Sequence, residues 1–412
     1  MKNTDNRSGD GSKNRLMQFK LLVIGLGIFT FCAAGLGIRL SHDSDDEVIY
    51  TALAAKIQKE GFKNYNLRDI SIERAGFFWD IRHQEKGNLL ELLTQSGAGY
   101  YDTDFYFNPP LFPALLAASN RILHPDSFLV LGRNMPQAFY FEQLWAVIPN
   151  VLLSVFFLAG IFVLANKSEK GTGVWALWLC GVSPVFLIAV FKAWSDILAA
   201  TLILWSFIAW DQEEKKIQNL FLSAVLCGLA LWTRTSSLFA IPIFLCCKWK
   251  RFPAWFGVVF LVAGYWFFSL YRYHGMAFYF PALGALNNRP EWLAIIHKPW
   301  HRYLYDLFYL SPLFLGVLFA GWKPETRLFW IWILSFIVPF SLLLHSNKPL
   351  GLEDRYLLPA YPAMAVLAAY GIKNIQKIVP KYFFLVIAGV GTLWSLRLAI
   401  GLVFSRESLN FL

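Results

Sequence analysis

Several segments of the chain are predominantly apolar over about 18 residues or more, the length that a helix needs to cross roughly 30 Å of hydrocarbon. Clear examples are residues 21–40, 143–165, 328–344 and 383–404. Composition agrees with lipid as the solvent, because 57% of the residues are hydrophobic and only 16% are charged, whereas soluble domains are about 25% charged. The chain is therefore predicted to be an all-α, polytopic membrane protein.

The apolar pattern predicts about eleven transmembrane helices, within a range of roughly 10 to 13. The expected spans are residues 17–40, 137–165, 172–191, 196–210, 218–232, 236–247, 254–273, 303–322, 328–345, 356–372 and 382–404. Several of them are short for a full crossing. The first follows a basic leader but lacks a clear small-residue cleavage site, so it is interpreted as a retained helix and not as a signal peptide.

Loop charges predict the orientation of these spans. With a cytoplasmic N-terminus, the inner loops are residues 166–171, 211–216, 248–251, 322–327 and 373–381. Lys and Arg number 17 on this side, counting the first 20 residues, and four in the short outer loops, as the positive-inside rule requires. The net charge of +10 is thereby explained without nucleic acid, for which the sequence holds no recognition motif. We expect a multi-pass protein of a bacterial plasma (inner) membrane, in contact with membrane lipids.

The chain is predicted to form one transmembrane domain over residues 1–412, with residues 1–16 as a cytoplasmic tail. A large first extracytoplasmic loop covers residues 41–136, and a smaller second one covers residues 274–302. No internal repeat is detected.

Two short helices are predicted in the first outer loop. Ser44 to Glu47 form a capping box, followed by an amphipathic helix over residues 48–60 and a glycine stop at Gly61. A second apolar stretch, residues 109–123, is short for a span. Both helices are expected to lie at the membrane surface. A true span at 109–123 would invert the topology of everything after it.

Short motifs along the chain resemble, in this order, those of C-type (GT-C) glycosyltransferases. They are Asp46-Glu47-Val48-Ile49-Tyr50, Tyr106-Phe107-Asn108-Pro109-Pro110-Leu111, Ser195-Asp196, Thr233-Arg234 and Arg355-Tyr356-Leu357-Leu358-Pro359-Ala360-Tyr361-Pro362. The closest similarity is to the protein O-mannosyltransferase and lipid A aminoarabinose transferase branch, and in layout it covers most of the chain. The resemblance implies transfer of a sugar from a polyprenyl-phosphate carrier to a lipid, glycan or protein acceptor on the outer face of the membrane.

Transfer from a glycosyl phosphate needs few catalytic groups. The phosphate is already a stable leaving group, so the reaction needs one base for the acceptor hydroxyl and cations for the departing phosphate. The family's catalytic aspartate matches Asp46, as the base of an inverting transfer, and Glu47 and Tyr50 beside it are substrate-binding candidates. Asp45 is the alternative base. The structural alternative for Ser44 to Glu47 is a helix cap.

Asp196 is the second catalytic candidate. It lies at the outer end of a predicted span, where a charged group is costly and often functional, and the resemblance also places an acidic residue there. It is expected to orient the acceptor or the base, or to help hold a divalent ion. Alternatively, Asp196 caps the next helix or pairs with Lys192, which is itself a substrate-binding candidate.

Arginines are the candidates for binding the donor phosphate. The related aminoarabinose transferases carry a lysine where this chain has Asn108, and that lysine is a phosphate-contacting candidate, so another cation must face the phosphate here. Arg355, followed by Tyr356, is the best choice because a guanidinium binds two phosphate oxygens at once. Arg234, at the family's Thr-Lys pair, is the next. The structural alternative for both arginines is snorkelling to the headgroups or pairing with the acidic residues just before Arg355.

No metal site and no required cofactor are predicted. His274, His297 and His301 flank the second outer loop without the close helical pairing of zinc motifs. The resemblance allows a divalent cation near the aspartates without requiring one.

A transporter or lipid-linked-sugar flippase is the main alternative, since such proteins also have many spans with a few embedded charges. The transferase is favoured because no inverted repeat is detected and because the embedded charges gather at the outer boundary instead of the midplane. A polysaccharide ligase or polymerase of another fold is the second alternative. In those proteins the large loop usually comes late, whereas here it comes first.

Overall fold

The computed structural model describes residues 45–68, 106, 108–123, 144–212, 217–275, 301–343 and 354–404. Within these ranges every regular element is a helix, in agreement with the predicted all-α class. The expected first span, at residues 17–40, and most of the second outer loop lie outside the described residues.

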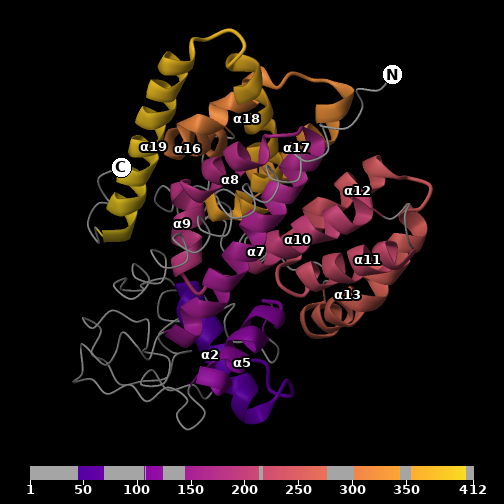
Figure 1. Ribbon diagram of the computed structural model, residues 1–412. Helices are drawn as coiled ribbons and strands as arrows, with labels where there is room; N and C mark the ends of the chain where they lie inside the picture. Colours follow the sequence, from indigo (N-terminus) through magenta and orange to yellow (C-terminus); the bar gives the residue numbers. More distant parts are fainter. Residues whose placement is uncertain are drawn as a thin grey trace, which may run out of the picture.

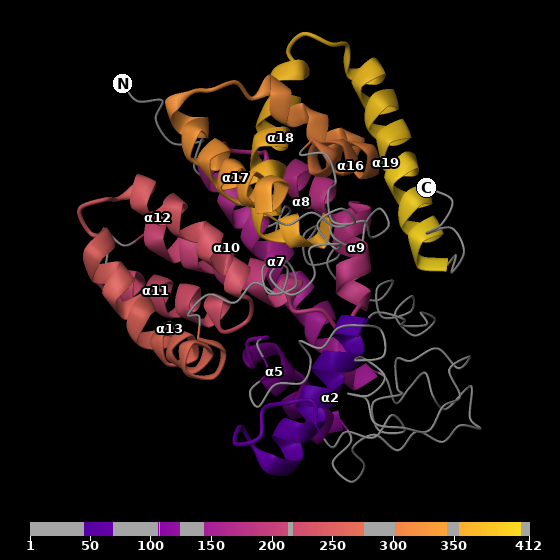
Figure 2. The same ribbon diagram turned by 180° about the vertical axis from the view of Figure 1, so that it is seen from behind.

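Figures 1 and 2 show the helices in two opposite views. They are α2 (Asp45–Glu60), α5 (Leu111–Leu123), α7 (Leu144–Ser168), α8 (Gly173–Gly181), α9 (Pro184–Phe191), α10 (Asp196–Asp211), α11 (Ile217–Leu231), α12 (Ile241–Cys247), α13 (Phe252–His274), α16 (Arg302–Leu310), α17 (Pro324–Leu343), α18 (Tyr361–Ile375) and α19 (Lys381–Phe404), with the 3-10 helices η3 (Thr235–Ala240), η4 (Pro312–Phe319) and η5 (Asp354–Ala360).

The helix α7 runs through the middle of the molecule, and most other helices pack in two groups beside it (Figures 1 and 2). In one group α11 packs between α10 and α13. In the other, α18 contacts α8, α17 and η4. α2 and α5 pack on each other at one end of α7, and α19 stands at the edge of the molecule.

Two single helices are long and apolar enough to cross a bilayer, at Ala146–Ser168 and Phe252–His274. A third crossing results if Gly173–Gly181 and Pro184–Val190, which are bent by 70°, count as one broken span. The described residues therefore contain two or three candidate spans by length and composition, and the larger number predicted from the sequence is not confirmed.

Proline interrupts two of the predicted spans. Residues 172–191 form α8 and α9, with Ser183 in an extended conformation before Pro184. Residues 303–322 form α16 and then η4, which begins at Pro312. Proline has no N–H to continue the hydrogen-bond ladder and clashes with the preceding turn. Each of these segments is helical, but as two short pieces.

The helix α2 has the predicted extent but not the predicted amphipathic character. It stops at Gly61, whose φ is 69° and whose N–H donates to the carbonyl of Ile57 at 2.9 Å, as in a glycine C-terminal stop. All side chains from Ile49 to Ala54 are buried, so this part of α2 has no exposed side. Its apolar and small residues occur all around the helix, and they belong to a buried cluster that includes residues of α5 on one side and Tyr65, Ala193 and Leu198 elsewhere. The expectation of a one-sided surface helix is corrected accordingly.

The helix α5 matches the second predicted outer-loop helix. Phe112, Leu116 and Asn120, which are four residues apart, are buried, whereas Ile122 is 78% exposed. This one-sided pattern follows the helical period. Whether α5 lies at a membrane surface stays a prediction.

The helix α18 is the buried centre of its group. Every residue from Tyr361 to Ala369 is buried. A Cβ atom on Gly371 would clash with the carbonyl oxygen of Gly316, so the backbone of η4 lies directly against α18. Small residues allow such close approach of helices in membranes.

The loops predicted to be cytoplasmic meet at one end of the molecule. Lys373 forms an ion pair with Glu169, and Lys167 forms one with Asp211. Lys248 donates to a carbonyl in the last turn of α10 at 3.3 Å. The loops that follow α7, α10, α12 and α18 therefore lie together, as a common side of the membrane requires. Which side this is stays a prediction.

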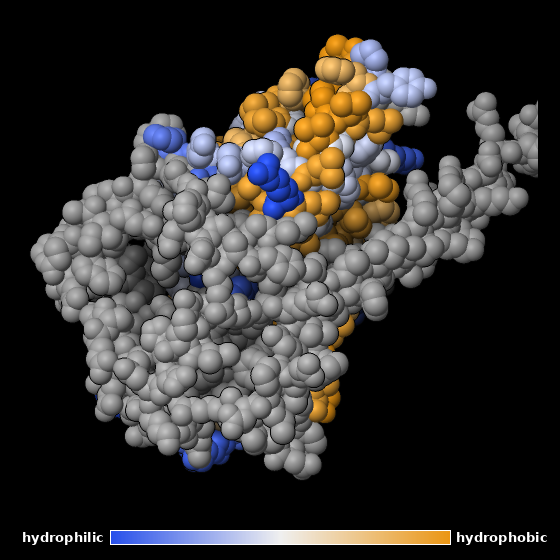
Figure 3. All heavy atoms as spheres, turned by 90° about the vertical axis from the view of Figure 1, so that its left-hand side faces the viewer, coloured by the Kyte–Doolittle hydropathy of each residue, from blue (hydrophilic) through white to orange (hydrophobic). Residues whose placement is uncertain are grey.

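The outer face of α19 is apolar. Tyr382, Phe383, Val390 and Leu393 are each at least 60% exposed. Figure 3 views the molecule from the side on which α19 lies, and its upper coloured region is mostly hydrophobic. Large exposed apolar patches are rare on soluble monomers, so this surface fits contact with lipid.

Candidate functional site

Asp196 lies in the first turn of α10, directly after the turn that follows α9. Its side chain is only 1% exposed. A position at a helix N-terminus stabilises negative charge, but a buried carboxylate also needs paired charges or hydrogen bonds. The groups that supply them define the candidate site.

Asn150 of α7 holds the turn that precedes Asp196. Its Nδ2 donates to the carbonyl oxygens of Lys192 at 2.6 Å and Trp194 at 2.9 Å. Carbonyls at the end of a helix have no intrahelical partner, so this buried amide satisfies them. The position of Trp194 and Asp196 thus depends on α7.

Two arginines from distant parts of the chain converge on Asp196. Arg234 Nη1 donates to Asp196 Oδ1 at 2.5 Å, and Arg355 Nε lies 3.8 Å from Asp196 Oδ2. Arg234 directly precedes η3, and Arg355 lies in the first turn of η5. Their side chains are only 18% and 6% exposed. Because both guanidinium groups are largely removed from water, their charges are weakly screened.

Aromatic rings fix the orientation of the two guanidinium groups. Arg355 Cζ lies 4.0 Å from the centroid of the Trp194 ring and 5.2 Å from that of Tyr356. Arg234 Cζ lies 4.7 Å from the same Tyr356 ring. Cations at these distances are attracted to ring faces, so Tyr356 links the two arginines.

The surroundings keep Arg234 charged. Burial alone would lower the pKa of its guanidinium, but the attraction of Asp196, with Tyr50 and Tyr356, outweighs burial and the repulsion of Arg355, so the pKa is raised above its usual value. The two arginines and Asp196 together carry a net charge of +1. Paired guanidinium groups in weakly hydrated surroundings are suited to a phosphate.

Tyr50 connects α2 to this cluster. Its hydroxyl lies 2.9 Å from Ser195 Oγ, and its ring packs edge-on against Phe112 with the centroids 5.3 Å apart. Asp46 precedes Tyr50 by four residues, so the two positions lie on the same face of α2, one turn apart. The side chains of Asp46 and Glu47 lie outside the described part of the structure.

Asn108 lies in the segment before α5, and its carbonyl accepts a hydrogen bond from the Tyr65 hydroxyl at 2.9 Å. The N–H of Leu111 donates to the carbonyl of Trp232 at 3.0 Å. Trp232 is two residues before Arg234 in the sequence, so this backbone hydrogen bond holds the segment that follows Asn108 next to the segment that carries Arg234.

The structure brings six of the candidates into one neighbourhood: Tyr50, Lys192, Asp196, Arg234, Arg355 and Tyr356. Asp196 pairs with two arginines, a combination that the sequence did not suggest, and the Lys192 ammonium lies 6.0 Å from the Trp194 ring.

Sequence reasoning missed Trp194 and Asn150. An amide inside an apolar span was the available signal for Asn150. Trp194 gave no signal, because tryptophan is common at membrane interfaces.

A divalent cation does not fit at Asp196. Its two oxygens face the guanidinium groups of Arg234 and Arg355, which would repel a cation. In addition, the described residues contain no group of three or more His, Cys, Asp and Glu side chains arranged to hold a metal ion.

No protein-family model matches the sequence, and no curated protein matches it either. The fold is nevertheless similar to solved structures. ArnT from Cupriavidus metallidurans, bound to undecaprenyl phosphate, is 12% identical with a TM-score of 0.58, over 96% of this chain and 72% of that one. The Archaeoglobus fulgidus oligosaccharyltransferase, in complex with Zn and sulfate, is 12% identical with a TM-score of 0.54, over 90% of this chain.

The archaeal oligosaccharyltransferase AglB, also from Archaeoglobus fulgidus and in complex with an inhibitory peptide and a dolichol-phosphate, is 12% identical with a TM-score of 0.53 over 91% of this chain. The present chain spans about half the length of the chains in these two archaeal structures, 52% and 55%. ArnT and AglB both have the GT-C fold. The fold expected from the sequence resemblance is therefore confirmed.

Proposed function

We propose that this protein is a membrane glycosyltransferase that moves a sugar from a polyprenyl-phosphate carrier to an acceptor hydroxyl on the extracytoplasmic face, with inversion at the anomeric carbon. The observation that carries the proposal is the convergence of Arg234 and Arg355 on Asp196, beside the helix α2, which carries Asp46 in its first turn. The similar folds support it, because ArnT was solved with undecaprenyl phosphate and AglB with a dolichol-phosphate. Both ligands present a phosphate on a polyprenyl chain.

In this proposal the two arginines act on the leaving group. The bond between the anomeric carbon and the phosphate oxygen breaks, and its electron pair stays on the phosphate. Arg234 and Arg355 stabilise the charge that develops there, in surroundings where little water competes. A phosphate stabilised in this way needs no proton to depart, so no general acid is required.

Asp46 acts as the general base. Its carboxylate takes the proton of the acceptor hydroxyl while that oxygen bonds to the anomeric carbon from the side opposite the phosphate. Attack from the opposite side inverts the configuration. Tyr50, one turn later on α2, joins this helix to Ser195 and thereby holds the base near the arginines.

Asp196 acts as a positioning residue. Its oxygens face the two arginines, so it holds the guanidinium groups at a fixed separation. Asn150 and Trp194 support it by fixing the turn before α10 and the plane of the Arg355 guanidinium. A preorganised pair of cations does not have to reorganise as the phosphate departs.

The experiment that tests the proposal incubates the purified protein with a panel of radiolabelled polyprenyl-phosphate sugars and a crude acceptor fraction from the membrane. Two products should appear together: a labelled acceptor and the free polyprenyl phosphate. A flippase would move the intact lipid-linked sugar across a vesicle membrane without cleaving it. Transbilayer movement without release of polyprenyl phosphate would therefore refute the transferase in favour of the flippase.

A further inference from the structure

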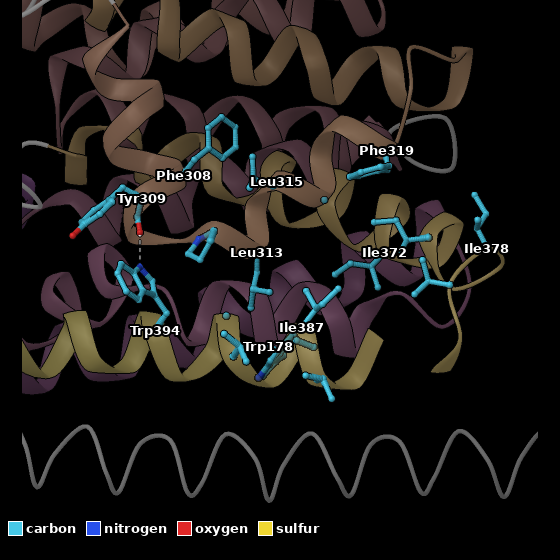
Figure 4. Close-up of a pocket in the computed structure, with 18 residues that line it drawn as sticks. Trp178, Phe308, Tyr309, Leu313, Leu315, Phe319, Ile372, Ile378, Ile387 and Trp394 are labelled. Atoms are coloured by element: carbon cyan, nitrogen blue, oxygen red, sulfur yellow. Dashed lines mark hydrogen bonds between the residues drawn. The ribbon is translucent and has the colours of Figure 1, made fainter. Parts of the chain in front are cut away.

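A cavity of about 880 Å³ lies between η4, α18 and α19. Figure 4 shows that its walls are apolar, with Phe308, Leu313, Ile372, Ile387 and Trp394 among the lining side chains. The indole N–H of Trp394 is already used, because it donates to the carbonyl of Tyr309 at 2.9 Å. Ligand pockets typically measure about 300–1,000 Å³, so the cavity is large enough for a substantial apolar group.

The cavity exists because α19 does not lie along α18. Gly391 of α19 approaches η4 so closely that a Cβ atom there would lie 2.5 Å from Leu313. α19 contacts α9 and η4 more extensively than it contacts α18. Consecutive antiparallel helices usually form a packed hairpin, and here the space between them is the cavity.

The cavity is separate from the arginine site. α18 begins at Tyr361, six residues after Arg355, and the cavity is lined by Ile372 and Ile375 in its last turn. A helix of 15 residues is about 22 Å long. This end of the cavity therefore lies in the opposite half of the protein, where the predicted cytoplasmic loops meet.

The same end of the cavity is basic. Ile378, which lines the cavity, lies within residues 373–381, where three lysines and no acidic residue occur. Lys373 forms an ion pair with Glu169, which neutralises its charge, and its Nζ also donates to the carbonyl of Lys170 at 3.2 Å. The side chains of Lys170 and Lys377 are exposed and form no ion pair with another described residue. Lys377 directly precedes Ile378 in the sequence, and Lys373 joins the Lys170 segment to α18, so basic residues occur in both segments at this end of the cavity.

We propose that this cavity binds one acyl chain of an anionic phospholipid whose phosphate lies against Lys170 and Lys377. Lipid tails are as apolar as the cavity walls, so burial of the chain gives little preference for any one lipid. The lysines then decide which lipid binds, and cations near a membrane surface attract anionic lipids. The bound chain fills the space between α18 and α19 and ties the last helix to the bundle. The tail of a polyprenyl carrier is the competing occupant.

The test measures phospholipid retained by the full-length protein in detergent, by native mass spectrometry, with phosphatidylglycerol and phosphatidylcholine of identical chains as probes. The wild type should retain one phosphatidylglycerol with roughly a 25-fold preference, since each of the two lysines contributes roughly fivefold. Ala388→Phe, which places a ring in the cavity, should lose this lipid. Leu393→Phe, on the exposed side of α19, should keep it.

Lys377→Gln tests the charge independently, because its exposed side chain can be changed without disturbing the fold. This variant should lower the preference for phosphatidylglycerol to roughly fivefold, the contribution of Lys170 alone, while retaining phosphatidylcholine at the wild-type level. Equal retention by Ala388→Phe and Leu393→Phe, or an unchanged preference in Lys377→Gln, overturns the proposal. Displacement of phosphatidylglycerol by equimolar polyprenyl phosphate, blocked by Ala388→Phe, also overturns it and assigns the cavity to the carrier.

Discussion

Replacing Asp196 with asparagine keeps the shape of the side chain but removes the charge that holds two arginines. Arg234 and Arg355 are only 18% and 6% exposed, so the variant leaves two like charges close together and largely out of water. Removing one partner of a buried ion pair costs about 3–5 kcal/mol. Because water still reaches part of Arg234, we expect a loss near the lower value, about 3 kcal/mol in the free energy of unfolding.

The two ion pairs should contribute unequally. Arg234 donates a hydrogen bond to Asp196 at 2.5 Å, whereas Arg355 Nε lies 3.8 Å from the other oxygen, beyond hydrogen-bond distance. Coupling energies between contacting residues are about 0.5–3 kcal/mol. We expect about 2–3 kcal/mol for Asp196 with Arg234 and about 1 kcal/mol for Asp196 with Arg355.

Double-mutant cycles with Asp196→Asn, Arg234→Gln and Arg355→Gln, followed by unfolding in mixed detergent micelles, measure these energies. The matched control is the ion pair of Lys167 and Asp211 at the other end of the molecule, whose side chains are 43% and 34% exposed. Exposed pairs contribute about 0–1 kcal/mol. A coupling of Asp196 with Arg234 no larger than this control would refute the arrangement.

Three further changes test the site and the topology. Arg355→Ala should lower donor affinity and turnover in a transfer assay, and Arg355→Lys should keep only part of the activity because lysine lacks the planar fork of the guanidinium. Asn108→Lys in the Arg355→Ala background should recover some transfer. Normal transfer by Arg355→Ala would show that the phosphate binds elsewhere. Tyr50→Phe should reduce turnover and cost about 1 kcal/mol of stability, and unchanged turnover would show that the bond to α10 is not needed. Cysteines introduced at Gln95 and Lys250 should be labelled from opposite sides of the membrane, and labelling of both from one side contradicts the predicted orientation.

The sequence indicated many of the residues that belong to the candidate site, but not how they are arranged in space. Asp196, Arg234 and Arg355 stood out because charges beside apolar spans are costly. Their mutual pairing could not be read from the sequence, since it depends on how α10, η3 and η5 pack and not on their spacing. The acidic residues just before Arg355 are nearer in sequence and were therefore the obvious partners to expect.

Helix positions were predicted better than helix continuity and burial. Residues 172–191 are helical as expected, but the proline at 184 divides them. The amphipathic prediction for α2 relied on its polar ends and overlooked the unbroken run of buried residues from Ile49 to Ala54. The cavity beside α19 had no signal in the sequence, because its lining residues are the same apolar types that face lipid.

The most direct test of the proposed transfer is the activity of Asp46→Asn, with donor binding measured on the same preparation. The amide keeps the shape of the side chain but cannot take the acceptor proton, so sugar transfer should fall by about 100- to 10,000-fold while the lipid donor still binds. Transfer within tenfold of the wild type would contradict the assignment of Asp46 as the base and direct the search to Asp45 or Asp196.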